Sequence, residues 1–561
     1  MTPAPTEQTT QTTPVLIVGG AVVGLSAALF LARRGIRPLL VERHPGALGH
    51  PRARIINPRT VEVFRATGLE EEIFAARSLT SELSEKLMVR AETLAGPEMF
   101  SAPMQDEAPE LTSEVTPCTW CSIDQDKLEL IVARRAAELG AELRWSTELV
   151  GFEQDEDGVT ATLRDTATGA ESTVRTQYLI GADGVRSRVR EAAGIGVEGP
   201  GTLIHTVSVV FKADLTEPLR GRDLGLGYFD QPDTGTLLMP LDGSRWVFYT
   251  PFHPERGERL EDFDEARCIE AIRAAVGVPD LAVDGLEVQV EKTGEKILGF
   301  DISAGLAERY REGRVFLAGD AAHTMPPTGA FGAATGIQDA DNLAWKLAAV
   351  LHRTAGPALL DSYEAERRPV ARFTIDYALA ELQERSHDQD DDGRPSYAAA
   401  ILGQLYPAGA LLPEPGEPGE AGEAGEAGAG LPPALDPRVL GRPGTRAPHT
   451  TVRCRGKELS ALDLFGEAPV LLTGPEGTGW EHAAGPAAQR LGIDLDVYRI
   501  GGEFVADPTG DWASRYGVDA DGAVLVRPDG FVAWRSAGAA DEPQARLEEV
   551  LTQVLDRAPG I

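Results

Sequence analysis

The glycine-rich segment Gly19–Gly24 has the spacing of a motif that binds dinucleotides. It follows the apolar run Val15–Val18 and precedes a helical pattern, and Glu42 ends the next apolar run. In such a strand–turn–helix–strand unit the glycines permit a tight turn, the helix N-terminus attracts a pyrophosphate, and the terminal acid accepts hydrogen bonds from ribose hydroxyls. An ordinary βαβ turn is the alternative. Ala21 replaces the central glycine, which predicts a slightly looser approach to the phosphates.

Two further acids end predicted strands later in the chain. Asp183 lies in Tyr178–Ser187 and Asp320 in Arg314–His323, each next to a glycine. A carboxylate at a strand end can accept hydrogen bonds from a polyol such as a ribityl chain. His323 is a candidate base, although a structural hydrogen bond is the more common role for a histidine in this setting. The three strand ends are therefore expected to converge on one flavin nucleotide.

These motifs, in this order, resemble those of the group A flavoprotein monooxygenases, the family of p-hydroxybenzoate hydroxylase and phenol hydroxylase. The resemblance covers nearly the whole chain, and Gly201–Thr206, Leu462–Gly466 and Leu525–Gly530 are most similar to hydroxylases of bacterial aromatic polyketides. It implies FAD contacts for the following residues: Gly19, Gly20, Val23, Gly24, Glu42, Arg43, Arg52, Gln125, Val150, Asp183, Asp320, Pro327, Gly332, Ala333 and Ala334.

The segment Pro326–Leu347 resembles the loop and helix whose N-terminal amides face the pyrimidine edge of the flavin in this family. Reduced flavin is anionic, and a helix N-terminus offers about half a positive charge together with free N–H donors. Such an arrangement stabilises the charge that reduction creates. Ala334 stands where the family usually has asparagine, so only a backbone contact is expected there.

The resemblance also implies the reaction. Reduced FAD would form a C4a-hydroperoxide with O2 and transfer the distal oxygen to an electron-rich ring carbon. NADPH or NADH would bind transiently as co-substrate, because the sequence has only one dinucleotide motif. Arg52 is the catalytic candidate, steadying the hydroperoxide or a phenolate, and a plain FAD contact is equally compatible. The sequence thus predicts a monooxygenase that hydroxylates a polycyclic aromatic polyketide or large phenol.

Three other functions are compatible with parts of this pattern. The same cofactor supports Baeyer–Villiger-type cleavage or rearrangement of a polyketide skeleton, and product structure would distinguish that outcome from hydroxylation. An FAD-dependent halogenase would need a Trp-x-Trp-x-Ile-Pro type segment, which the sequence lacks. A flavin or polyketide binder without catalysis would show no substrate-stimulated oxidation of the nicotinamide coenzyme. Hydroxylation is the favoured interpretation.

Positioning these motifs requires a mixed α/β (α+β) fold. We expect a disordered tail over residues 1–13, a Rossmann-like FAD-binding domain over 14–200 and 296–387, and an interleaved antiparallel sheet over 201–295. Part of 80–120 should contribute to the substrate pocket. Because strand side chains alternate, half of the aromatic and apolar residues on these strands should face the substrate. The candidates are Tyr228, Met239, Trp246 and Phe248, with Phe229, Leu238 and Tyr249 beside them.

The C-terminal part of the chain is predicted to form a separate unit. Residues 388–441, with an acidic run and a Gly-Glu-Ala repeat, have the composition of a solvated linker. Residues 442–561 show the strand and helix order of a small thioredoxin-like domain. Its loop Gly474–Gly479 stands where a redox thioredoxin carries CxxC, and it contains no cysteine. The domain is therefore expected to be structural.

Composition limits the possible partners to small molecules and copies of the chain. The 87 acidic and 53 basic residues give a net charge of −34, which disfavours nucleic acids and acidic membranes. No apolar run has the length of a membrane span and the start lacks a signal-like segment, so a cytoplasmic monomer or homodimer is expected. Cys118 and Cys121 have CxxC spacing, but no second ligand pair accompanies them, and no metal site is predicted.

Overall fold

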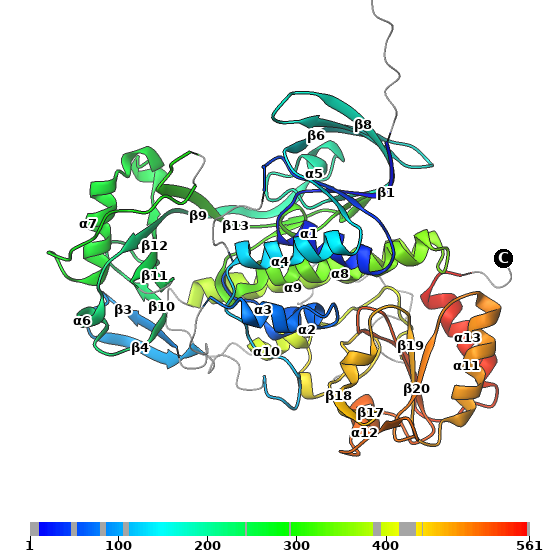
Figure 1. Ribbon diagram of the computed structural model, residues 1–561. Coiled ribbons are helices and arrows are strands. Elements are labelled where there is room, and N and C mark those ends of the chain that lie inside the picture. Colours follow the sequence, from blue (N-terminus) through cyan, green and yellow to red (C-terminus); the bar gives the residue numbers. More distant parts are fainter. Residues whose placement is uncertain are drawn as a thin grey trace, which may run out of the picture.

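The computed structural model describes residues 11–46, 53–78, 86–104, 111–241, 244–290, 293–384, 394–414, 434–439 and 441–557. Within these ranges the chain forms a mixed α/β fold with two large sheets and a smaller C-terminal α/β domain (Figure 1). The predicted fold class is confirmed. Strand β1 begins at Gln11, so residues 11–13 belong to the first sheet and not, as expected, to a disordered tail.

A parallel sheet forms the centre of the FAD-binding domain. Its order β15-β8-β1-β2-β5 joins Val315–Leu317, Glu171–Gly181, Gln11–Val18, Leu39–Val41 and Glu142–Arg144. Strand β14 (Arg311–Glu312) and the hairpin β6 (Thr147–Gln154) and β7 (Val159–Asp165) extend it with antiparallel pairs. Val18 pairs with Gly181, and Leu317 pairs with the same glycine. The carboxyl ends of three strands therefore meet at one edge.

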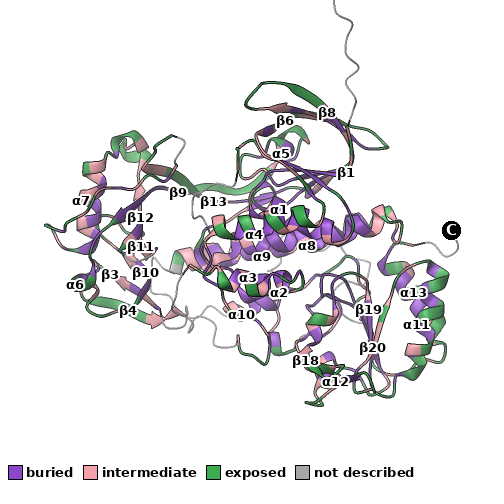
Figure 2. Cartoon of the chain, viewed as in Figure 1, coloured by how far each residue is buried: buried purple, intermediate pink, exposed green. Residues whose placement is uncertain are grey.

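Helices α1 (Val22–Arg33), α4 (Gln125–Glu138), α8 (Phe331–Leu351) and α9 (Ser362–Glu384) form the layer beneath this sheet (Figure 1). Helix α1 packs against both α4 and α8. Most of α1 and α8 is buried (Figure 2), because their small and aliphatic side chains face neighbours on nearly every side. Helix α8 begins at Phe331, within the segment Pro326–Leu347 that is predicted to form a loop and a helix.

The second sheet is antiparallel over most of its width and lies to one side of the helical layer (Figure 1). Helix α7 (Glu265–Val276) covers one face, and the other face borders the cavity described below. The long strands β9 (Val197–Lys212) and β13 (Ile297–Ala307) connect this sheet to the FAD-binding domain (Figure 1). Its strands, in order, are β16 (His323–Thr324), β13 (Ile297–Ala307), β9 (Val197–Lys212), β12 (Arg245–Phe252), β11 (Thr236–Pro240), β10 (Leu224–Phe229), β3 (Leu87–Ala91) and β4 (Glu98–Pro103).

The C-terminal domain is a four-stranded sheet flanked by helices. Its order β20-β19-β22-β23 joins Asp496–Arg499, Val470–Thr473, Ala523–Val526 and Val532–Ser536. Helices α11 (Thr478–Leu491) and α13 (Pro543–Val554) pack together on one face. A second small sheet contains β17 (Thr451–Cys454), β18 (Lys457–Ser460) and β21 (Val505–Ala506), and α12 (Trp512–Tyr516) lies nearby.

Part of the predicted linker belongs to the folded body. Residues 394–414 include helix α10 (Tyr397–Leu402), whose side chains from Ala398 to Leu402 are buried. Tyr406 is also buried, and its ring stacks on Phe531 of the C-terminal domain with the centroids 4.0 Å apart. This segment is therefore packed between the two domains, and the expectation of a solvated linker is wrong for it. The Gly-Glu-Ala repeat lies outside the described residues.

Candidate functional site

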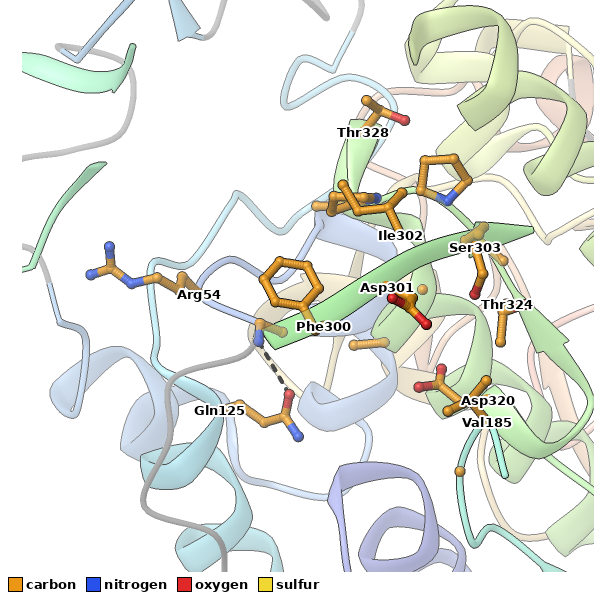
Figure 3. Close-up of a pocket in the computed structure, with 18 of the residues that line it drawn as sticks. Arg54, Gln125, Val185, Phe300, Asp301, Ile302, Ser303, Asp320, Thr324 and Thr328 are labelled. Atoms are coloured by element: carbon orange, nitrogen blue, oxygen red, sulfur yellow. Dashed lines mark hydrogen bonds between the residues drawn. The ribbon is translucent and has the colours of Figure 1, made fainter. Parts of the chain in front are cut away.

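One cavity of about 2500 Å³ extends from the converging strand ends to the open face of the second sheet. Cavities for drug-sized ligands usually measure about 300–1,000 Å³. This space is therefore large enough for a dinucleotide together with a large second molecule. Figure 3 shows part of it, with Asp301, Ser303 and Asp320 on one side and Arg54 and Gln125 on the other.

The glycine-rich turn forms the nucleotide end of the cavity. Gly19 has φ +111°, and a Cβ there would lie 2.3 Å from the carbonyl oxygen of Ala182. A Cβ on Gly24 would lie 1.9 Å from the carbonyl oxygen of Gly19, so both positions require glycine. Gly19, Gly20 and Val23 line the cavity, whereas Gly24 packs behind the turn. A side chain at Gly19 would collide with the strand end at Ala182, so the tight turn at this end of the cavity depends on glycine.

The first turn of α1 is held by a buried carboxylate. Glu129, on α4, accepts a hydrogen bond from the backbone N–H of Val22 at 3.0 Å and another from the Gln125 side-chain amide at 2.7 Å. Gln125 in turn accepts from the backbone N–H of Ala53 at 3.1 Å (Figure 3). Gln125 lines the cavity and, through Glu129, connects Ala53 to the first turn of α1.

Glu42 and Arg43 border the same end of the cavity. The Glu42 carboxylate accepts from the backbone N–H groups of Gly20 at 2.7 Å and His44 at 2.9 Å, so it fixes the turn and retains lone pairs for a ribose hydroxyl. Val150 is 41% exposed and does not line the cavity. Its neighbour Leu149 does, because adjacent residues of β6 point to opposite faces.

The two strand-end acids have different surroundings. Asp183 accepts hydrogen bonds from the hydroxyl of Ser187, which caps the short helix α5 (Arg188–Ala192), and from the backbone N–H of Val189 in the first turn of that helix at 3.1 Å. Asp320 is exposed to the cavity and lies beside Val185 in Figure 3. Both carboxylates line the cavity at the edge where the parallel strands end.

The N-terminus of α8 also points into the cavity. The turn before it contains Gly329 at φ +74° and Ala330 at φ +54°, and no side chain caps the helix. Pro327, Gly332 and Ala333 line the cavity. Ala334 is buried behind them. Uncapped amides and the positive end of a 21-residue helix suit an anionic group.

The open face of the second sheet forms the other end of the cavity. Tyr228, Leu237, Met239 and Tyr249 line it, and Phe300 of β13 meets Tyr249 edge to face at 5.7 Å. Trp246 and Phe248, which we expected among the substrate contacts, point to the opposite face and are buried beneath α7 together with Leu238. Phe229 packs in the same core and also borders the cavity. The expected alternation is present, and it places these side chains in the core.

Sequence reasoning missed several residues on this wall. Trp120 stacks on Tyr397 with the ring centroids 5.8 Å apart, and both line the cavity. Arg54 lines it as well, with its Nε donating to Asp124 at 2.9 Å and a terminal nitrogen donating to the carbonyl oxygen of Pro240 at 2.5 Å. Burial raises the pKa of Tyr249, and the Arg54 charge acts against that rise. Arg52 lies outside the described residues.

His323 and Cys118 lie away from the cavity, whereas Cys121 borders it but is almost fully buried. The His323 side chain is fully buried and its Nε2 contacts the Asp339 carboxylate at 2.7 Å. Cys118 and Cys121 are buried free thiols, and burial raises the pKa of each, that of Cys121 to about 11. Among the described residues no group of three or more histidine, cysteine or acidic side chains is arranged to hold a metal ion. Within the same ranges, no helix is long and apolar enough to cross a membrane.

Comparison with known proteins shows the family to which this chain belongs. Residues 12–378 match the family model of an FAD binding domain, and residues 441–558 match the model of the aromatic-ring hydroxylase C-terminal domain. This chain belongs to the FAD-binding aromatic-ring hydroxylases. The resemblance inferred from the three motifs is confirmed, and the chain is a member of a family of FAD-dependent aromatic monooxygenases.

Individual members of this hydroxylase family match over almost the full chain. Tetracenomycin A2 monooxygenase-dioxygenase of Streptomyces glaucescens is 40% identical, covering 98% of each chain. Aklavinone 12-hydroxylase of Streptomyces purpurascens is 39% identical, covering 97% of this chain and 99% of its own. The solved ternary complex of aklavinone-11 hydroxylase with FAD and aklavinone is 39% identical with a TM-score of 0.87, covering 97% of this chain and 99% of that one.

Proposed function

We propose that this hydroxylase inserts one atom of O2 into a polycyclic aromatic polyketide or a comparably large phenol, with NADPH or NADH as the reductant. The observation that carries the proposal is the single cavity of about 2500 Å³, which joins a dinucleotide cradle to an apolar and aromatic sheet face. Relatives named for aklavinone and tetracenomycin support a substrate of that size and class.

The residues around the cavity fit FAD. The glycine cradle at Gly19, the carboxylates of Glu42 and Asp320 and the uncapped start of α8 offer the contacts that a diphosphate, hydroxyl groups and an anionic ring need. We assign the cofactor contacts to Gly19, Gly20, Val23, Glu42, Arg43, Gln125, Asp183, Asp320, Pro327, Gly332 and Ala333. Leu149 takes the place that we had given to Val150. When bound at these residues, FAD would supply the redox and oxygen-transfer chemistry, with the nicotinamide coenzyme as the source of electrons.

The protein's own contribution is positioning and electrostatics. Tyr249 and Phe300 present an aromatic surface that orients a flat ring system and excludes water from it. The amides at the start of α8 stabilise negative charge near the cofactor. Arg54, held by Asp124, places a fixed positive charge in the substrate end of the cavity. There it favours the ionised form of a phenolic substrate, which is the more electron-rich form.

The decisive experiment offers the purified flavoprotein a panel of anthracyclinone-like and angucyclinone-like compounds with NADPH and oxygen-18 gas. We expect at least one compound to accelerate NADPH oxidation and to gain one labelled oxygen by mass spectrometry. A product with a cleaved ring would show that the enzyme catalyses Baeyer–Villiger-type cleavage and not hydroxylation. Unlabelled products, or stimulation only by single-ring phenols, would contradict the proposal.

A further inference from the structure

A fully buried carboxylate holds the strand end that carries Asp320. Asp339, on α8, accepts hydrogen bonds from the backbone N–H of Gly319 at 3.2 Å and from His323 at 2.7 Å. Burial by itself raises the pKa of Asp339, but the charges of Arg367 and His323 outweigh it, so the pKa lies below its ordinary value. An ionised Asp339 therefore fixes the backbone immediately before Asp320.

Arg367 connects this carboxylate to the start of α8 and to the inter-domain segment. Its Nε donates to Asp339 at 2.8 Å, and one terminal nitrogen donates to the carbonyl oxygen of Thr335 at 3.1 Å. The other terminal nitrogen donates to the Tyr406 hydroxyl at 3.3 Å. One planar guanidinium thus joins two residues of α8, Thr335 and Asp339, to Tyr406, which lies against the C-terminal domain.

The C-terminal domain completes the network from the other side. Arg527, in the turn between β22 and β23, donates to Glu366 at 2.7 and 2.8 Å and to Asp529. Asn342 of α8 donates to both acids, at 2.7 Å to Glu366 and at 3.1 Å to Asp529. Asn342 also reaches the Tyr406 hydroxyl at 3.5 Å, and the Tyr406 ring stacks on Phe531. All of these side chains are buried.

Simple attachment of a domain does not require such a network. Apolar residues of similar volume bury an interface at least as favourably as charged ones, and removing one partner of a buried ion pair is strongly destabilising. Directional polar contacts instead fix one geometry. Here the geometry that they fix includes two cavity-lining elements, the strand end before Asp320 and the start of α8.

We propose that the C-terminal domain of this hydroxylase positions the FAD site through the buried relay Tyr406–Arg367–Asp339. Tyr406 and Arg367 are positioning residues, since both contact α8 and neither lines the cavity. They reach the strand end through Asp339, which accepts from the Gly319 N–H. The domain lacks a redox motif in its Gly474–Gly479 loop, and its function is to hold the cofactor pocket in its binding geometry.

The test compares two tyrosines that are equally buried in this protein. Tyr406→Phe removes the hydroxyl that joins Arg367 to the inter-domain segment and keeps the ring on Phe531. Tyr516→Phe removes a buried hydroxyl that donates to the carbonyl oxygen of Pro448 at 3.2 Å, outside the relay. Apoprotein of each variant is titrated with FAD by fluorescence, and its melting temperature is measured without FAD.

We expect Tyr406→Phe to raise the FAD dissociation constant about fivefold, the effect of losing one ordinary hydrogen bond, and to shift the visible flavin spectrum. Tyr516→Phe should lower the melting temperature by about as much as Tyr406→Phe does, because each loses one buried hydrogen bond. It should leave the FAD affinity unchanged. Arg367→Lys, which keeps the charge but cannot span all three contacts, should weaken FAD binding more. Unchanged FAD affinity in Tyr406→Phe, or equal losses in both tyrosine variants, would overturn the proposal. No substrate enters these measurements, so they are independent of the proposed reaction.

Discussion

Neighbouring residues of β12 allow the substrate-binding face to be separated experimentally from the core. Phe248 is 1% exposed, pairs across the sheet with Leu238 and Val209, and packs beneath α7. Tyr249 is the next residue and lines the cavity opposite Phe300. Phe248→Ala should therefore lower the stability of the protein, and Tyr249→Ala should impair catalysis.

The expected magnitudes follow from burial. Truncation of a buried phenylalanine to alanine costs about 3–5 kcal/mol, which corresponds to a fall in melting temperature of at least about 6 °C for a domain of this size. Tyr249→Ala loses an aromatic pair worth about 0.5–1.5 kcal/mol, so its melting temperature should change little. Removing its contact with a bound ring system should raise KM about tenfold, because a fully buried aromatic contact contributes about 1.5–3 kcal/mol.

The assay measures melting temperature by calorimetry and steady-state NADPH oxidation with the best compound of the polyketide panel. Leu238→Ala and Leu237→Ala on β11 form a matched control pair, since Leu237 lines the cavity and Leu238 is buried. The reasoning is refuted if Tyr249→Ala unfolds as early as Phe248→Ala, or if Phe248→Ala raises KM more than Tyr249→Ala does.

Four further outcomes are expected. Gly24→Ala would bring a Cβ to 1.9 Å from a backbone oxygen of the glycine-rich turn, so the variant should purify colourless and bind no added FAD in a spectroscopic titration. Arg54→Lys keeps the charge but loses a hydrogen bond of the guanidinium, and kcat/KM should fall about tenfold with FAD affinity unchanged. Native protein should show no alkylation of Cys118 or Cys121 by mass spectrometry near neutral pH, because burial raises the pKa of both thiols. Burial opposes ionisation of Glu366, but the surrounding cationic groups lower its pKa from 4.5 to about 2, so its contribution to stability is complete above pH 4.5 and is lost as the pH falls toward 2. Melting temperatures of wild type and Glu366→Gln across that range should converge at the acidic end.

The convergence of the three strand ends could be predicted from the sequence because parallel strands place their carboxyl ends at one edge. Each motif begins where an apolar run stops, at Val18, Gly181 and Leu317. The structure pairs these residues in register across adjacent parallel strands. The prediction succeeds because the glycine and aspartate residues stand in the turns that directly follow these parallel strands.

The side-chain directions on the second sheet could not be predicted with the same certainty. A shift of one residue reverses every side chain of a strand, and both faces of β12 are apolar or aromatic, because one meets α7 and the other meets the cavity. Trp246, Phe248 and Tyr249 therefore look alike in the sequence. The same alternation along a strand explains why Leu149 of β6 lines the cavity and its neighbour Val150 does not.

The buried polar contacts of Tyr406, Arg367 and Asp339 could not be predicted from the sequence either. Arg367 lies in a helix rich in charged residues, a composition typical of a solvated face, and yet it is fully buried. Its partners Asp339 and Tyr406 are 28 and 39 positions away in the sequence. Long-range pairing of this kind leaves no local periodic signal, because helical patterns report only neighbours three or four residues apart.

The two ends of the cavity are joined by backbone as well as by side chains. Strand β16 follows Asp320 after only two residues, and its Thr324 pairs with Gly305 of β13. The same β13 carries Phe300 on the substrate face. Main-chain hydrogen bonds therefore connect the strand end proposed to hold the cofactor to the wall proposed to hold the substrate. Because a sheet transmits position more rigidly than a loop, the distance between the reacting atoms is set by the register of β13 and β16, and substitutions on the exposed loops should alter substrate entry before they alter the site of oxidation.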